Sequence, residues 1–85
     1  MLCINKLQIS YDSKFDILSY IWGDTSNAYG DEDIDNIVIL KDIDSEEVVG
    51  YTIINFKRIC ENKSKEYNII SQMFNIPEVM HSCGL

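Results

Sequence analysis

The sequence predicts an α+β fold in which a four-stranded antiparallel β-meander is packed by one C-terminal helix. Two observations support this prediction. Up to residue 55, alternating or apolar segments are separated by polar turns, which is typical of strands. Beyond residue 55, apolar residues recur at helical spacing as far as the single proline, Pro77.

The first two strands are expected at residues 2–11 and 15–22. Leu7, Ile9 and Tyr11 alternate with polar residues in the first segment, and residues 12–14 supply Asp and Ser for a turn. The second segment is rich in aromatic and β-branched residues and is apolar on both faces. Residues 23–33 are polar and contain Gly23 and Gly30, so they predict a loop with at least one positive φ angle.

The third and fourth strands are expected at residues 37–40 and 48–55. The run Ile-Val-Ile-Leu at 37–40 is too short for a helix, and we expect this strand in the centre of the sheet. A turn at residues 44–46 leads into the fourth strand, which returns antiparallel to the third. Gly50 within the fourth strand indicates a bulge or the close approach of another backbone.

The helix is expected to begin after Ser64, its N-cap, and to end at Pro77. Its apolar face consists of Tyr67, Ile70, Met73 and Phe74. Residues 56–62 are either a short helical turn or irregular. Residues 1–76 would then form one small domain, and residues 77–85 a flexible tail.

A single helix covers at most one face of this sheet, whereas the second strand is apolar on both faces. Monomers rarely expose a contiguous apolar patch above a few hundred Å². We therefore expect a homodimer or another partner on the second face, unless the first strand curls over and closes the sheet on itself.

The net charge of −7 is concentrated in one part of the 85-residue chain. Residues 23–49 hold nine acidic residues against Lys41 alone, whereas residues 1–22 balance to zero and residues 50–85 carry +1. Affinity for nucleic acid comes mainly from Lys and Arg, so this balance disfavours direct nucleic-acid binding. The basic residues that leave phosphate contact open as a lesser alternative are Lys57, Arg58, Lys63 and Lys65.

A localised acidic segment beside aromatic residues favours binding to a basic protein surface. Carboxylates steer the encounter, and aromatic side chains provide anchors at the centre of an interface. The candidate partner-binding residues are Asp24, Asp31, Glu32, Asp33, Asp35, Tyr20, Trp22 and Tyr29. The alternative is that the charges only keep a small protein soluble and that the aromatic residues belong to the core.

Metal binding and catalysis are poorly supported by the sequence. Residues 31–35 resemble the start of an EF-hand calcium loop, but Asn36 stands where that loop requires Gly, and Asp42 where it requires Glu. A solvated acidic loop is therefore favoured over a weak cation site. His81 and Cys83 are two soft ligands, whereas structural zinc needs four. With its single histidine near the C-terminus and no Gly-rich phosphate loop, the chain is expected to be neither an enzyme nor dependent on a cofactor.

The cysteines and the N-terminal sequence bear on the compartment. Cys3, Cys60 and Cys83 are odd in number and widely spaced, unlike a secreted disulfide framework, so we expect reduced thiols. No basic stretch leads into an apolar core at the start, and no apolar run approaches membrane-spanning length. The expected location is the cytoplasm, with no membrane partner.

Three motifs carry a resemblance to a known family. They are Tyr11-Asp12, then Asp16-Ile17-Leu18 followed by Tyr20-Ile21, and finally Val49-Gly50 through Thr52-Ile53-Ile54-Asn55. Residues 9–58 thus resemble a family of short bacterial proteins classed only as a domain of unknown function. In the family pattern Leu is followed directly by Tyr-Ile, whereas here Ser19 intervenes. This insertion predicts a bulge or a reversal of faces within the strand.

The resemblance implies a modest functional expectation, since the family has no established activity. Its members are small, stand alone and often occur beside small candidate toxins, which implies an antitoxin or protein-neutralising role. Together with the acidic segment, this suggests a non-enzymatic inhibitor of a nucleic-acid-acting partner, namely a toxin, a nuclease or a phage-defence complex. The alternative is a homodimeric structural or regulatory module with an incidental acidic loop.

Overall fold

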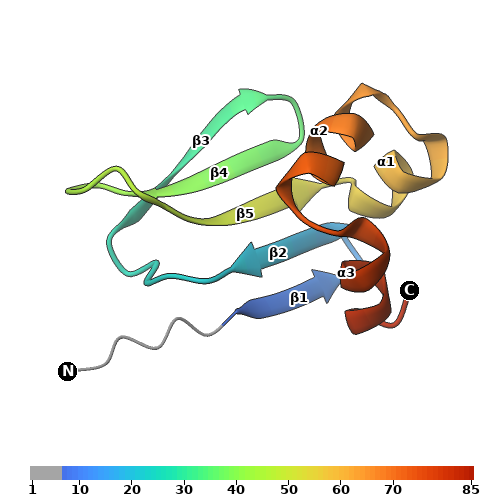
Figure 1. The fold of residues 1–85 in the computed structure, drawn as a ribbon, viewed down its shortest axis with the longest axis horizontal. Helices are drawn as coiled ribbons and strands as arrows, with labels where there is room; N and C mark the ends of the chain where they lie inside the picture. Colours follow the sequence, from blue (N-terminus) through green and yellow to red (C-terminus); the bar gives the residue numbers. More distant parts are fainter. Residues whose placement is uncertain (1–6) are drawn as a thin grey trace.

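A computed structural model describes residues 7–85 of the chain, so Cys3 and the start of the expected first strand lie outside the described residues. The fold is α+β, as the sequence predicts (Figure 1). The described strands are β1 (Gln8–Asp12), β2 (Ile17–Ile21), β3 (Ala28–Ile34), β4 (Ile37–Asp42) and β5 (Val48–Ile54). The described helices are α1 (Phe56–Asn62), α2 (Lys65–Met73) and α3 (Ile76–Ser82).

The sheet differs from the expected four-stranded meander. Within residues 7–85 it has five antiparallel strands in the order β1-β2-β5-β4-β3. After β2 the chain crosses to the far edge, forms β3, and returns through β4 to β5, which pairs with β2. The middle strand is therefore β5, and the strand at residues 37–40, β4, lies next to it in the interior of the sheet. Ile53 of β5 lies opposite Leu18 on one side and Ile37 on the other, and all three side chains are buried.

Strand β3 occupies most of the segment that we expected to be a polar loop. Its pairing with β4 shifts at a bulge between Asp31 and Ile34. As an edge strand with one neighbour, β3 tolerates charged side chains, which discourage pairing of its free edge with other chains. The expected positive φ angle in this segment is also wrong. Gly23 is needed for space instead, because a Cβ there would lie 2.9 Å from the Cβ of Val49.

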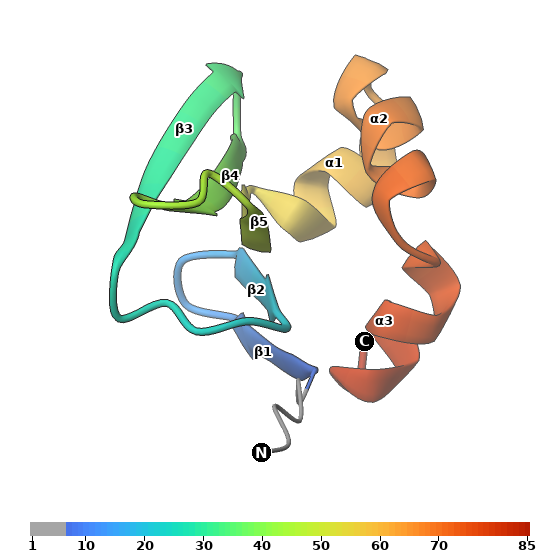
Figure 2. The same cartoon turned by 60° about the vertical axis from the view of Figure 1, so that its left-hand side comes forward.

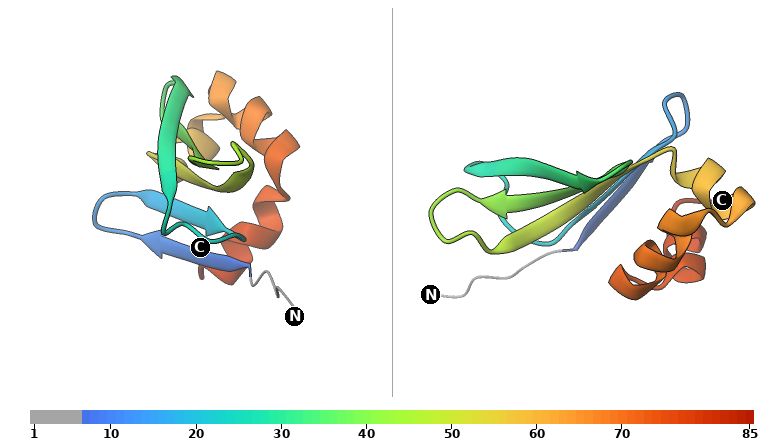
Figure 3. Two further views of the ribbon diagram at one scale, coloured as in Figure 1. Left: turned by 90° about the vertical axis from the view of Figure 1, so that its left-hand side faces the viewer. Right: turned by 90° about the horizontal axis from the view of Figure 1, so that it is seen from above.

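The helices cover one face of the sheet near one end (Figures 2 and 3). The buried cluster between them combines residues of β2, β4 and β5 with residues of all three described helices. Its members are Leu18, Ile37, Ile53, Phe56, Ile59, Cys60, Ile70, Phe74, Ile76 and Val79. The strands extend beyond this cluster, so part of the helix-side face lies outside the helical cover (Figure 3).

The C-terminal region contains three helices rather than one. Residues 56–62 form α1, and Ser64 is the N-cap of α2 as predicted, but α2 ends at Met73. Pro77 lies in the first turn of α3, where its missing N–H has no intrahelical partner to lose. The Asn75 side chain caps this helix by accepting the N–H of Glu78 at 3.0 Å. Most of the expected flexible tail is therefore helix, and its Val79 is 3% exposed.

The face of the sheet that points away from the helices carries apolar side chains on either side of a row that contains Ser10, Ser19 and Thr52. Register places Ile17 opposite Ile54, Ile21 opposite Gly50 and Leu40 opposite Gly50 on this face. Gly50 confirms both expectations, since the β4–β5 register shifts beside it and a Cβ there would lie 3.0 Å from the carbonyl oxygen of Tyr20. Pairing of β2 is continuous through Ser19, so the strand contains neither a bulge nor a reversal there.

The two thiols of the described residues differ in burial. Cys60 is buried and Cys83 is half-buried, and both are free, as the sequence predicts for these two cysteines. Burial raises the pKa of the Cys60 thiol above its ordinary value.

In residues 7–85, none of the helices combines the length and the apolar character needed to span a bilayer.

Candidate functional site

The eight candidate residues fall into three groups along the sheet. Four of them lie on the helix-side face, namely Tyr20, Trp22, Tyr29 and Asp31. Three lie in or beside the turn between β3 and β4, namely Glu32, Asp33 and Asp35. Asp24 lies near the opposite end of β3, which spans about 20 Å because seven residues rise about 3.3 Å each. The candidates therefore do not form one compact patch.

Tyr20 and Asp31 belong to one row of side chains across the sheet. Tyr20 lies opposite Tyr51, Tyr51 opposite Ile39, and Ile39 opposite Asp31. Side chains directly opposite in paired strands share a face, so this row links the aromatic residues to the acidic edge strand. The two ends of the row are three strand spacings apart, or about 14 Å.

The aromatic candidates differ in how far they are available to a partner. The Tyr20 ring stacks on the ring of Phe74 at a centroid distance of 4.6 Å and an angle of 18°, so it is held against α2. Trp22 packs edge-on against Tyr51 at 5.0 Å and is half-buried. Tyr29 is 39% exposed. Tyr20 thus serves the core, whereas Trp22 and Tyr29 present surface.

Asp31 is the candidate carboxylate with a cation beside it. Lys41 Nζ donates to Asp31 Oδ2 at 3.1 Å, and this hydrogen bond raises the pKa of Lys41 above its ordinary value. It is the one ion pair within 4.0 Å among residues 7–85. Because Lys41 is the sole cation in residues 23–49, the other eight carboxylates of that segment have no positive partner there.

The turn between β3 and β4 is tied to the rest of the fold through Asn36. The Asn36 N–H donates to Glu32 Oε2 at 3.0 Å, and its side-chain amide donates to Glu66 Oε2 at 3.4 Å. The Asn55 amide in turn donates to Asn36 Oδ1 at 3.2 Å. Glu32 therefore shapes the turn, while the side chains of Asp33 and Asp35 are exposed.

Residues near Asp24 form a second acidic group, of which the candidate set included Asp24 alone. The Asn27 side-chain amide donates to Asp44 Oδ2 at 2.9 Å, and the Ile43 N–H donates to the Asn27 carbonyl at 2.9 Å. These bonds join the loop after β2 to the turn between β4 and β5. The carboxylates of this loop and this turn are Asp24, Asp42, Asp44, Glu46 and Glu47. The charge count already placed this turn in the acidic segment, but its closeness to Trp22 depends on the strand order.

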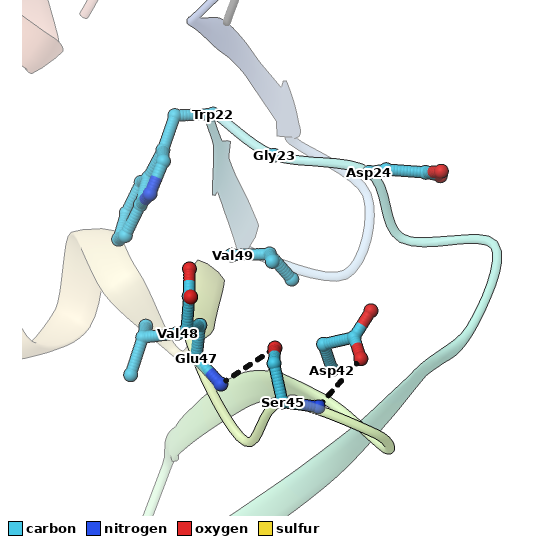
Figure 4. A pocket seen from close by; sticks show the side chains of 8 residues that line it. All are labelled: Trp22, Gly23, Asp24, Asp42, Ser45, Glu47, Val48 and Val49. Carbon is cyan, nitrogen blue, oxygen red and sulfur yellow. Dashed lines mark hydrogen bonds between the residues drawn. The ribbon is translucent and has the colours of Figure 1, made fainter. Parts of the chain in front are cut away.

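A depression of about 210 Å³ lies between that loop and that turn (Figure 4). It is lined by Trp22, Gly23, Asp24, Asp42, Ser45, Glu47, Val48 and Val49. Asp24 Oδ1 accepts the Ser26 N–H at 2.9 Å, and this bond lowers the pKa of Asp24. Asp42 Oδ1 accepts the N–H groups of Asp44 and Ser45 at 2.8 and 3.1 Å.

A zinc centre in a protein uses three or four ligating side chains held together. Within residues 7–85, no three His, Cys, Asp or Glu side chains are grouped so that they could hold an ion. His81 lies in the last turn of α3, and Cys83 follows as the C-cap.

Comparison of the chain with protein-family models, with curated proteins and with solved structures found no match.

Proposed function

We propose that this protein is a non-enzymatic protein-binding module, an acidic inhibitor or antitoxin-like protein that neutralises a nucleic-acid-acting partner. The partner would be a basic protein, namely a toxin, a nuclease or a phage-defence complex. The observation that supports this most is the uncompensated negative charge on the half of the sheet formed by β3, β4 and the turn into β5.

Most carboxylates of this half of the sheet are exposed to solvent and have no cation of the described chain beside them. Asp33 and Asp35 are exposed at one end of this half, and Asp44, Glu46 and Glu47 are exposed at the other. Trp22 and Tyr29 add aromatic surface on the helix-side face. A surface of this kind competes with nucleic acid for a basic site, because opposite potentials accelerate association and aromatic anchors slow dissociation.

The test is partner capture with charge-reversed variants. Asp33→Lys with Asp35→Lys changes two exposed carboxylates and spares Asp31 and Glu32, whose bonds to Lys41 and Asn36 support the fold. The matched control reverses Glu61 and Glu78, which are exposed on α1 and α3. Wild type and control should capture the same basic protein and inhibit its nuclease activity or nucleic-acid binding.

The variant should lose both capture and inhibition while keeping the melting temperature of the wild type. The proposal fails if the captured protein binds wild type and Asp33→Lys/Asp35→Lys equally well. It also fails if the captured protein binds or cleaves nucleic acid to the same extent with and without the wild-type chain.

A second candidate function is a homodimeric structural or regulatory module. It is favoured by the sheet face that points away from the helices, where Ile17, Ile21, Val38, Leu40 and Ile54 are half-buried. No helix of the described residues lies on that face (Figure 3). This alternative predicts a dimer in sedimentation equilibrium at micromolar concentration, converted to monomer by Leu40→Glu. A wild type that sediments only as a monomer would exclude it.

A further inference from the structure

The depression beside Trp22 combines three kinds of side chain: aromatic, apolar and acidic. It is lined by the Trp22 indole, by the side chains of Val48 and Val49, and by the carboxylates of Asp42 and Glu47 (Figure 4). In the figure the Glu47 side chain extends toward the space between Trp22 and Val49, whereas Asp24 points away from it. The depression therefore combines aromatic and apolar side chains with carboxylates in one lining.

The volume of the depression suits a single side chain of a partner better than a small molecule. At about 210 Å³, the depression is smaller than the roughly 300–1,000 Å³ typical of small-molecule and cofactor sites. It is open, so it suits one side chain projecting from another protein. The valine and indole side chains match the methylene stem of a long side chain, and the carboxylates match a cationic head.

Two polar side chains of the lining, Asp42 and Ser45, are held by hydrogen bonds within the turn. Asp42 directs Oδ1 to backbone N–H groups, and Ser45 Oγ accepts the Glu47 N–H at 3.3 Å. Neither Asp42 nor Glu47 lies within 4.0 Å of a Lys or Arg of the described chain, since the ion pair there joins Lys41 to Asp31. A cation from a partner would therefore meet carboxylates that this part of the chain does not neutralise.

We propose that the depression binds an arginine side chain of the partner. This inference rests on the proposed function and specifies its chemistry. The guanidinium would lie against the Trp22 indole and donate to the Glu47 carboxylate, with Asp42 adding negative charge beside it. Arginine suits this geometry better than lysine because its planar, weakly hydrated head both stacks on aromatic rings and donates two parallel hydrogen bonds to a carboxylate.

The test uses the full chain, ¹⁵N-labelled, titrated with N-acetyl-arginine amide as the probe. The sequence contains one tryptophan, so one indole N–H signal reports on the depression. This signal should shift and saturate in the millimolar range. Glu47→Gln should weaken binding by about two- to fivefold, in line with exposed ion pairs, while Glu61→Gln on α1 should leave it unchanged. N-acetyl-citrulline amide is the uncharged control and should give no saturating shift.

Several outcomes would overturn the inference. Equal shifts with the citrulline probe would mean that charge is not recognised, and equal affinity in Glu47→Gln would remove the assigned carboxylate. A larger shift with Mg²⁺ or Ca²⁺ than with arginine would identify a cation site instead. The Asp33→Lys/Asp35→Lys variant separates the two proposals, because it should lose the partner yet keep the arginine response.

Discussion

The hydroxyl of Tyr11 donates a hydrogen bond of 2.6 Å to Oδ1 of Asp16, and this pair joins the β1–β2 hairpin to the start of α1. The same Asp16 carboxylate accepts the N–H groups of Lys57 and Arg58 at 2.8 and 3.2 Å. Two free N–H groups of the first turn of α1 are thus satisfied from a residue about 40 positions earlier, as a capping side chain would satisfy them.

Replacing Tyr11 with Phe should destabilise the fold by about 1.5 kcal/mol, because a hydrogen bond to a charged carboxylate is lost while the ring remains. The measurement is the free energy of unfolding in urea at pH 7. Tyr29→Phe is the matched control, since it removes a hydroxyl from an exposed ring. Equal stability of Tyr11→Phe and wild type would show that the bond contributes nothing.

Tyr11 should ionise at a higher pH than an ordinary tyrosine. The hydrogen bond to Asp16, followed by burial, raises the pKa of Tyr11 to about 12 from an ordinary value of 10.0. A raised pKa stabilises the fold fully below pH 10, and this stabilisation is lost as the pH rises toward 12. In a titration of phenolate absorbance, one of the five tyrosines should therefore ionise last. Asp16→Asn should bring that tyrosine back toward the others.

The loss of folding free energy at acidic pH should depend on Asp16. Burial alone would raise its pKa, but hydrogen bonds from Tyr11, Lys57 and Arg58 outweigh burial and hold it below the ordinary value of 3.8. A lowered pKa stabilises the fold above pH 3.8, and this contribution disappears as the pH falls through the folded-state pKa. Urea unfolding at pH 7 and pH 3 should show that Asp16→Asn destabilises more at pH 7. The same difference at both values would contradict this.

The fold class and several elements could be predicted because local patterns determine them. The Ile-Val-Ile-Leu run, the turn at residues 44–46 and the N-cap at Ser64 all depend on neighbours in sequence. Strand order depends on pairing between distant segments, which alternation does not report. Strand β3 was missed because its charges suit an edge, whereas the prediction treated them as a loop.

The candidate site was predictable as a charged segment but not as a geometry. Tyr20 could not be separated from Trp22 by sequence, because only the packing of Phe74 shows that Tyr20 belongs to the core. Glu47 was not among the candidates because it is far from Trp22 in the chain, and the pairing of β2 with β5 brings the two together. The sequence pattern places Asp16 in a strand, because α1, whose N–H groups it accepts, begins about 40 residues later.

The two sheet glycines should differ in their tolerance of a methyl group. At Gly50 a Cβ would meet the backbone of β2, with the Tyr20 oxygen at 3.0 Å and the Ile21 Cα at 3.1 Å. At Gly30 the near contact is a side-chain methyl of Val38 at 2.8 Å, on a half-exposed face where it can move. Gly50→Ala should therefore cost about 2–3 kcal/mol and Gly30→Ala about 1 kcal/mol or less. Equal urea midpoints would contradict the close approach at Gly50.

The last prediction concerns α3, which the sequence suggested would be a flexible tail. Val79 is 3% exposed against the core, so Val79→Ala should lower the free energy of unfolding by about 2 kcal/mol. Asn75→Ala removes the cap and should cost about 1 kcal/mol. His81→Ala, at an exposed position of the same helix, is the control and should be nearly neutral. If Val79→Ala unfolds at the urea concentration of the wild type, α3 does not stay docked on the core in solution. The domain would then end near residue 76, and the aromatic cluster around Phe74 would have to hold α2 without it.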